Sequence, residues 1–205
     1  MFEDAFKSAL LDFTNKEIVE QLWLEIKSLY SARGRHYHVL SHLDHLIHEL
    51  SQVKDNITDW QLLVFSIAYH DIVYNPLKSN NEEKSAGFCI ERLSLLKFSD
   101  AQRNKCFSQI IATKAHSQSD DKDTNYLVDA DLAILGSAPS EYRDYKVRIR
   151  KEYKMFPDLI YKPGRKKVLH SFLSKQHIYH TEEFRHKFEQ QAVENINDEL
   201  KELSS

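Results

Sequence analysis

The stretch DWQLLVFSIAYHDIVY, residues 59–74, is apolar on nearly every side of a helix, which predicts that this helix is central and buried. Near its end it carries an adjacent imidazole and carboxylate, His70 and Asp71. Burying such groups costs free energy unless they are hydrogen bonded, paired with a charge or bound to a metal. One cation between the two side chains would satisfy both, because imidazole nitrogen and carboxylate oxygen are good metal ligands.

The rest of the chain predicts an all-helical fold. Its 205 residues include only four glycines and four prolines, too few for a turn-rich all-β protein. Capping boxes at Thr14–Glu17, Thr58–Gln61 and Ser99–Gln102 each precede an apolar periodic run. We therefore predict an all-α, single-domain helical bundle, with a motif-bearing core of about residues 30–155 and C-terminal helices in 156–205 packed on it. The expected helices are residues 3–12, 15–31, 36–52, 59–74, 82–97, 100–116, 124–135, 140–155, 165–175 and 182–203.

Charge and hydropathy exclude several classes of partner. The formal net charge of −3 gives no global positive field, so nucleic acid is not expected to bind. No run of about 18 or more apolar residues is present, so no membrane span or membrane partner is expected. The acidic N-terminal stretch lacks the basic residues of a signal peptide, which makes the cytoplasm the expected location. Cys89 and Cys106 lie among apolar neighbours and are expected to be free, buried thiols. A homodimer is left open.

A second segment, RHYHVLSHLDHLIHEL at residues 35–50, holds five of the eleven histidines. On a helical wheel of about 100° per residue, His42 falls at the border of the apolar stripe. His38 and His45 lie further from the stripe, and His48 lies on the solvent side. His42 is therefore the histidine expected to point inward, with His38 one turn before it.

A third apolar segment, LVDADLAIL at residues 127–135, is interrupted by Asp129 and Asp131. Asp129 is explained equally well as a helix-capping residue, whereas Asp131 lies two residues further into the helix. With His42 and the adjacent pair of residues 70 and 71, Asp131 gives two nitrogens and two oxygens from three helices. Such a set leaves positions open on an octahedral divalent ion for water and a phosphate oxygen.

The order His…His-Asp…Asp on a helical scaffold resembles the HD superfamily of metal-dependent phosphohydrolases. The chain is similar in particular to a subgroup of predicted HD-type phosphohydrolases of about 200 residues, over roughly residues 30 to 200. The motifs that carry this resemblance are RHYHVLSH from Arg35, AYHDIVY from Ala68, NEEKSA from Asn81, IIATKAH from Ile110, DADLAILG from Asp129 and VRIRKEY from Val147.

The resemblance implies that His42, His70, Asp71 and Asp131 bind the metal. His38 is an alternative to His42, and Asp129 is an alternative to Asp131. The implied cofactor is a divalent ion of Mn, Fe, Co, Ni, Mg or Zn. The implied function is hydrolysis of a small phosphoester, such as a nucleotide, by a metal-activated water. The alternatives are a catalytically silent metal- or nucleotide-binding sensory module with the same fold, and a helical scaffold whose polar pairs are ordinary buried hydrogen bonds.

Further residues are candidates for catalysis or substrate binding. Glu82 is a candidate base that orients the water, or simply an acid at a helix N-terminus. His116 is a candidate phosphate partner, proton donor or second-metal ligand, or a solvated histidine at a helix end. Asp71 also counts as catalytic through the metal. The candidate phosphate-binding residues, each alternatively a surface side chain, are Arg35, His38, Lys114 and Arg150.

Overall fold

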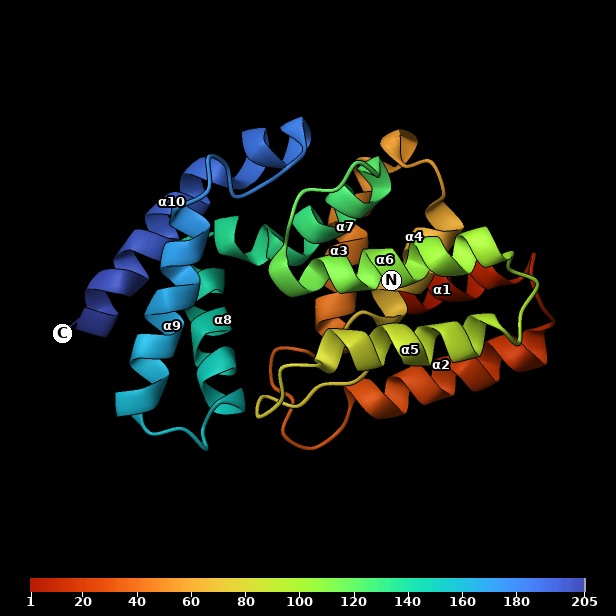
Figure 1. Ribbon diagram of the computed structural model, residues 1–205, viewed down its shortest axis with the longest axis horizontal. Coiled ribbons are helices and arrows are strands. Elements are labelled where there is room, and N and C mark those ends of the chain that lie inside the picture. Colours follow the sequence, from red (N-terminus) through yellow and green to blue (C-terminus); the bar gives the residue numbers. More distant parts are fainter. Residues whose placement is uncertain (205) are drawn as a thin grey trace. The chain divides into compact units, whose positions relative to one another are not determined.

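Every regular element in residues 1–204, the part of the chain that the computed structural model describes, is helical (Figure 1). The all-α prediction is therefore confirmed. Within the same residues, no helix combines the length and apolarity needed to cross a membrane. The α-helices are α1 Phe2–Leu10, α2 Lys16–Tyr30, α3 Leu40–Ser51, α4 Trp60–Tyr69, α5 Asn81–Leu93, α6 Asp100–Ala115, α7 Lys122–Leu132, α8 Pro139–Glu152, α9 Asp158–Leu173 and α10 Glu182–Ser204, with 3-10 helices η1 Lys54–Asn56 and η2 Ala133–Gly136.

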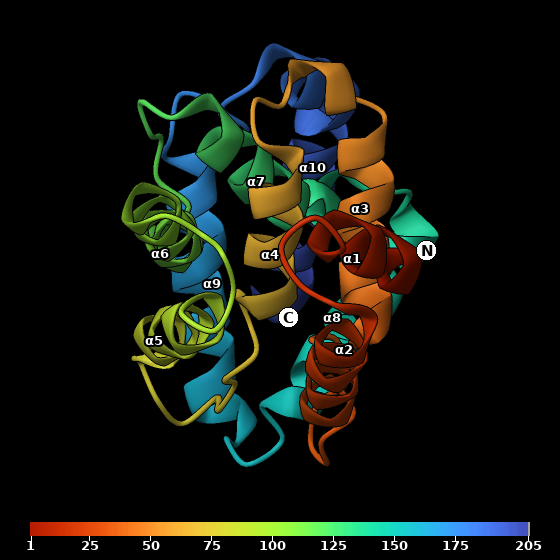
Figure 2. The ribbon, with the colours of Figure 1, turned by 90° about the vertical axis from the view of Figure 1, so that its right-hand side faces the viewer.

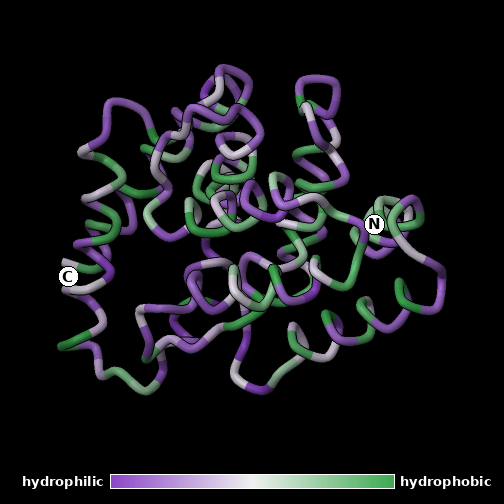
Figure 3. Tube along the Cα trace, turned by 45° about the vertical axis from the view of Figure 1, so that its right-hand side comes forward, coloured by the Kyte–Doolittle hydropathy of each residue, from purple (hydrophilic) through white to green (hydrophobic). Residues whose placement is uncertain are grey.

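The chain divides into two compact units, Met1–Val128 and Asp129–Ser205. The expectation of a single domain stays a prediction. Apolar and polar positions are interleaved along the helices of both units (Figure 3). This interleaving is what amphipathic helices need in order to bury one face and expose the other.

Helix α4 forms the centre of the first unit. Residues 62–69 are all buried, as the unbroken apolar run predicts. Helices α1, α3, α5 and α6 pack on it, with α1 and α3 on one side and α5 and α6 on the other (Figure 2). Each buried Leu, Ile or Phe stabilises the fold by about 1.5–3 kcal/mol. The buried helix α4 therefore holds the residues at its ends in place.

Two of the predicted capping boxes are wrong by one residue. Helix α2 is capped by Asn15, whose side chain accepts a hydrogen bond from the Ile18 amide at 3.0 Å. Helix α4 is capped by Asp59. The Thr58 and Asp59 amides in turn donate to the buried carboxylate of Asp123, at 2.8 and 3.0 Å. This long-range acceptor leaves Thr58 outside the helix. The third box, at Ser99 and Gln102, is confirmed.

In the second unit α8 and α10 pack on η2, and α9 packs on α10 (Figure 1). Helix α9 begins at Asp158, before the expected start at residue 165, and runs through Gly164. Pro163 lies in the second turn of α9, so the single hydrogen bond that it cannot make is lost close to the helix start. The segment expected as one helix over residues 124–135 is α7 followed by η2.

Gly136 is required by the contact between η2 and α10. A Cβ atom at this position would lie 2.5 Å from the carbonyl oxygen of Phe188 and 2.6 Å from its Cβ. We expect Gly136→Ala to lower the free energy of unfolding by about 2 kcal/mol or more, because backbone of α10 would have to move. Urea unfolding measures this. The control is Gly164→Ala on α9, where nothing lies within 4 Å and alanine is the better helix former. Equal stability of the two variants would contradict the prediction.

Candidate metal centre

His70 and Asp71 lie where helix α4 ends. His70 is the C-cap residue, and its backbone amide donates to the Ser66 carbonyl at 2.9 Å. The side chain of His70 is almost wholly buried, and the Asp71 side chain is 15% exposed. His70 Nε2 lies 3.2 Å from Asp71 Oδ2. Because the helix ends here, these adjacent residues can bring their side chains to one point.

His42 joins this pair from the first turn of α3. It is 3% exposed, whereas His48 on the same helix is exposed, so the prediction that His42 points inward is confirmed. His42 Nε2 lies 3.2 Å from His70 Nε2 and 3.9 Å from Asp71 Oδ2. These three side-chain atoms therefore form a triangle within the first unit.

The hydrogen bonding of His70 fixes its tautomer. Its Nδ1 lies 2.8 Å from the Ile67 carbonyl oxygen, which can only accept, so Nδ1 carries the proton. In the neutral ring Nε2 then presents a lone pair toward His42 and Asp71. Such a second hydrogen bond commonly orients metal-binding histidines.

Two of the three separations in this cluster suit ligands that share one metal ion. Ligands about 2.1 Å from an octahedral ion lie about 3.0 Å from each other along an edge. The separations of 3.2 Å from His70 Nε2 to His42 Nε2 and to Asp71 Oδ2 are close to this value. His42 and His70 belong to a group of residues that could hold a metal ion.

His38 lies at the edge of the same cluster. It precedes α3, which begins at Leu40 rather than at residue 36 as expected, because Val39 is extended. His38 Nε2 is 3.7 Å from Asp71 Oδ2, and its ring lies 4.3 Å from that of Tyr74. The structure thus brings both histidines that the sequence left as alternatives near Asp71, with His42 next to His70.

Arg35 holds the backbone around the cluster. Its guanidinium donates to the carbonyl oxygens of Asp71 and Ile72, both at 2.8 Å, and of His38 at 3.1 Å. These bonds tie the segment before α3 to the turn after α4. Sequence reasoning missed this positioning role, because backbone carbonyls leave no pattern in a sequence. The predicted contact of Arg35 with phosphate stays a prediction.

The other candidates of the first unit lie on α5 and α6. Lys114 forms an ion pair with Glu83 and donates to the Ser79 carbonyl at 2.7 Å. Glu82 is half-buried in the first turn of α5. His116 ends α6 with a φ of 47°, and it is the sole non-glycine residue with positive φ in the described chain, residues 1–204. The catalytic roles of these residues stay predictions.

Asp129, the alternative to Asp131, has a structural role in the second unit. It is buried, and its carboxylate accepts hydrogen bonds from the His180 amide at 2.8 Å and from the Thr181 amide and hydroxyl, both at 2.7 Å. Burial raises the pKa of the Asp129 carboxyl, and these hydrogen bonds partly oppose the shift. Asp129 therefore fixes the segment that leads into α10 rather than capping its own helix.

Asp129→Ala is expected to lower the free energy of unfolding by about 2–4 kcal/mol, because it leaves two amides and a hydroxyl without their acceptor. Urea unfolding measures the loss. The same folded variant should bind as much Mn²⁺ per chain as the wild type after equilibrium dialysis. Loss of Mn²⁺ from a folded Asp129→Ala protein would instead make Asp129 a ligand.

Two further predicted site residues belong to the second unit. Asp131 lies half-buried near the end of α7. Arg150 donates to Asp158 at 2.8 Å and to the carbonyl oxygens of Tyr153 and Phe156 at 2.9 and 3.0 Å. In this arrangement Arg150 stabilises the connection between α8 and α9, and its predicted contact with phosphate stays a prediction.

No protein-family model, curated protein or solved structure matches the chain. The resemblance to HD phosphohydrolases accordingly stays a prediction from its motifs. The chemistry of the His42, His70 and Asp71 cluster is therefore the main indication of function.

Proposed function

We propose that the protein is a metal-dependent phosphohydrolase of the HD type that hydrolyses a small phosphoester such as a nucleotide. The observation that supports this most is the approach of His42 Nε2, His70 Nε2 and Asp71 Oδ2 to within 3.9 Å of one another, in a largely buried place. Three ionisable groups this close need a shared cation or a fully satisfied hydrogen-bond network.

The donor set favours a first-row transition metal. Imidazole suits Fe, Ni and Zn better than Mg, which prefers oxygen ligands. A divalent ion held here would lower the pKa of a water and polarise a phosphoryl oxygen. The bond from His70 Nδ1 to the Ile67 carbonyl supports this role, because in the neutral ring it places the lone pair on Nε2.

We infer that Asp131 supplies a second carboxylate ligand. The resemblance to HD phosphohydrolases supports this, because it gives Asp131 a ligand position. Helix α7 is continuous from Lys122 to Leu132. Asp131 lies on this helix two residues after Asp129, whose carboxylate is already bonded to the Thr181 segment. Metal content of Asp131→Asn beside that of Asp129→Asn tests this choice.

The neighbouring side chains supply the remaining roles in this proposal. Arg35 keeps the Asp71 backbone in place, and its loss would loosen the cluster without removing a ligand. His38 is 18% exposed and 3.7 Å from Asp71 Oδ2, so it is the imidazole that a substrate phosphate would reach. We propose that His38 contacts the phosphate or gives a proton to the leaving oxygen. Glu82 is the proposed base that orients water.

Phosphate release from a panel of nucleotides and generic phosphoesters tests the function. Protein stripped with EDTA should be inactive and should regain activity with Mn²⁺, Co²⁺, Ni²⁺, Fe²⁺ or Zn²⁺. The double variant His70→Ala, Asp71→Ala should stay inactive with every metal. Equal phosphate release by wild type and double variant across the panel would rule out the proposed phosphohydrolase activity. Metal binding without turnover of any substrate would favour the sensory module.

A further inference from the structure

A second place in the molecule has the features of a ligand site, and it involves neither the histidines nor Asp71. It is a pocket of about 550 Å³ among α8, α9 and α10, lined wholly by residues of the second unit. This volume lies within the range of about 300–1,000 Å³ that is typical of small-molecule sites. The residues that matter for its chemistry are Arg143, Val147, Lys151, Tyr161, Lys162 and Leu203.

The pocket carries positive charge that the protein does not neutralise. Its three acidic lining residues each have a partner: Asp158 pairs with Arg150, Glu199 with Arg165 and Glu202 with Lys146. The remaining lining cations are Arg143, Lys151 and Lys162, and none of them forms an ion pair within the described residues 1–204. Three unpaired cations around one pocket attract an anion with more than one negative charge.

The cations surround an apolar surface. Arg143, Val147 and Lys151 are spaced i, i+4 and i+8 on α8, so they share one face of the helix. Between the two cations, the branched side chain of Val147 is 53% exposed and offers apolar surface that a ligand in the pocket could cover. The ligand should therefore bring an apolar body as well as a charge.

Tyr161 indicates that the apolar part of the ligand is aromatic. Its ring lines the pocket and has the Arg150 guanidinium 4.6 Å from its centroid. A planar ring braced in this way is a stacking surface for another aromatic ring. Arginine and lysine side chains are also the usual partners of phosphate oxygens.

We propose that this pocket binds an aromatic phosphomonoester of the nucleoside monophosphate class. The phosphate lies against Arg143, Lys151 and Lys162, and the ring system covers Val147 and stacks on Tyr161. The inference does not rest on the proposed phosphohydrolase activity, because no residue of the metal cluster lines the pocket.

Calorimetric titration of the full chain with AMP in the presence of EDTA tests the proposal, because the chelator removes any metal at the histidine cluster. Wild type should bind AMP, and adenosine and inorganic phosphate should each bind at least about tenfold more weakly. Hexyl phosphate, which has the charge without the ring, should also bind more weakly. Equal affinities for AMP and adenosine would show that the pocket does not recognise the phosphate. Tighter binding of hexyl phosphate than of AMP would show that it does not recognise an aromatic ring.

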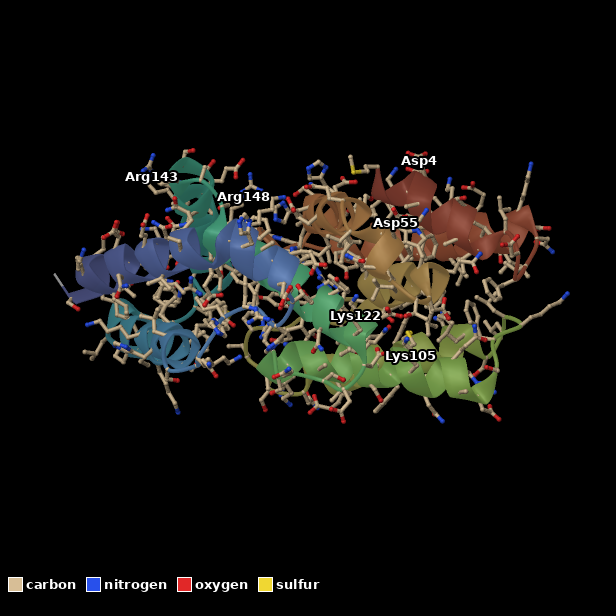
Figure 4. All side chains as sticks on the ribbon, turned by 90° about the horizontal axis from the view of Figure 1, so that it is seen from above. Asp4, Asp55, Lys105, Lys122, Arg143 and Arg148 are labelled. Atoms are coloured by element: carbon tan, nitrogen blue, oxygen red, sulfur yellow. The ribbon has the colours of Figure 1, made fainter. Side chains whose placement is uncertain are left out.

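Variants locate the binding. The double variant Arg143→Ala, Lys151→Ala should weaken AMP binding by about tenfold or more, since two charge-assisted contacts are lost. Arg148→Ala is the matched control, because Arg148 is an exposed arginine of the same helix that does not line the pocket (Figure 4). His70→Ala should bind AMP as the wild type does. Absence of binding to wild type, or binding that is lost in His70→Ala and kept in the double variant, would overturn the proposal.

Discussion

His70→Ala is expected to lower both metal content and metal-dependent phosphate release, the latter by about a thousandfold or more. A bound metal supplies several kcal/mol of transition-state stabilisation, and each 1.4 kcal/mol is about tenfold in rate. His70 Nε2 is the central atom of the cluster, at 3.2 Å from both His42 Nε2 and Asp71 Oδ2. Metal content after dialysis and the rate of phosphate release are measured on the same samples.

The control for His70→Ala is His48→Ala. His48 lies exposed on α3, the helix that carries His42, so its loss removes an imidazole without touching the cluster. His48→Ala should keep the metal content and the rate of the wild type. If His70→Ala folds, keeps its metal and releases phosphate at the wild-type rate, the proposed centre is wrong.

Glu199→Ala is expected to cost about 3–5 kcal/mol of unfolding free energy, because it leaves a buried arginine without its carboxylate. Arg165 Nε and Nη2 donate to Glu199 at 2.8 and 3.1 Å, and the Tyr142 hydroxyl donates to the same carboxylate at 2.5 Å. The side chains of Arg165 and Glu199 are 9% and 4% exposed. Burial is the main cause that raises the pKa of Tyr142 far above its usual range, and the Glu199 carboxylate adds to it, so the hydroxyl keeps its proton to donate.

Urea unfolding followed by circular dichroism measures this loss. The control is Asp198→Ala on the same helix, where the pair Asp198–Lys201 has side chains 72% and 77% exposed and should contribute nothing measurable. The double variant Arg165→Met, Glu199→Leu should recover much of the stability, because it removes both buried charges. Equal loss of unfolding free energy in Asp198→Ala and Glu199→Ala would show that burial does not set the contribution of these ion pairs.

The periodicity of apolar residues predicted those features of the fold that depend on neighbouring residues in the sequence. The all-α class and the central position of α4 follow from periodicity and from the apolar run. The inward direction of His42 also follows from the helical wheel, although α3 starts four residues later than expected. The wheel still applies because His42 and the core residues after it lie within the actual helix.

Element ends depend on partners that are far away in the sequence. Helix α4 was expected to continue to residue 74 but ends at Tyr69. The Asp71 and Ile72 carbonyls are bonded to Arg35, and the Val73 amide donates to the Ser85 hydroxyl at 3.1 Å. These side chains replace the helical hydrogen bonds of the backbone. No periodic pattern encodes such contacts, so the turn that carries Asp71 could not be predicted.

The two aspartates of α7 illustrate the same limit at the candidate site. A carboxylate in an apolar helix indicates only that some partner exists. For Asp129 the partner is the Thr181 segment, 52 residues away in the chain. The sequence favoured Asp131 over Asp129 as a ligand, with Asp129 as an alternative, and the hydrogen bonds of Asp129 now give that residue a structural role.

We propose above all that His42 and His70 hold a divalent metal. The most direct test is the metal content of each chain after equilibrium dialysis against Mn²⁺, Co²⁺ or Zn²⁺, measured by elemental mass spectrometry. We predict about one ion per chain for wild type and for His48→Ala, and almost none for the double variant His42→Ala, His70→Ala. Wild type that binds no ion, or a folded double variant that binds as much as wild type, would contradict the claim.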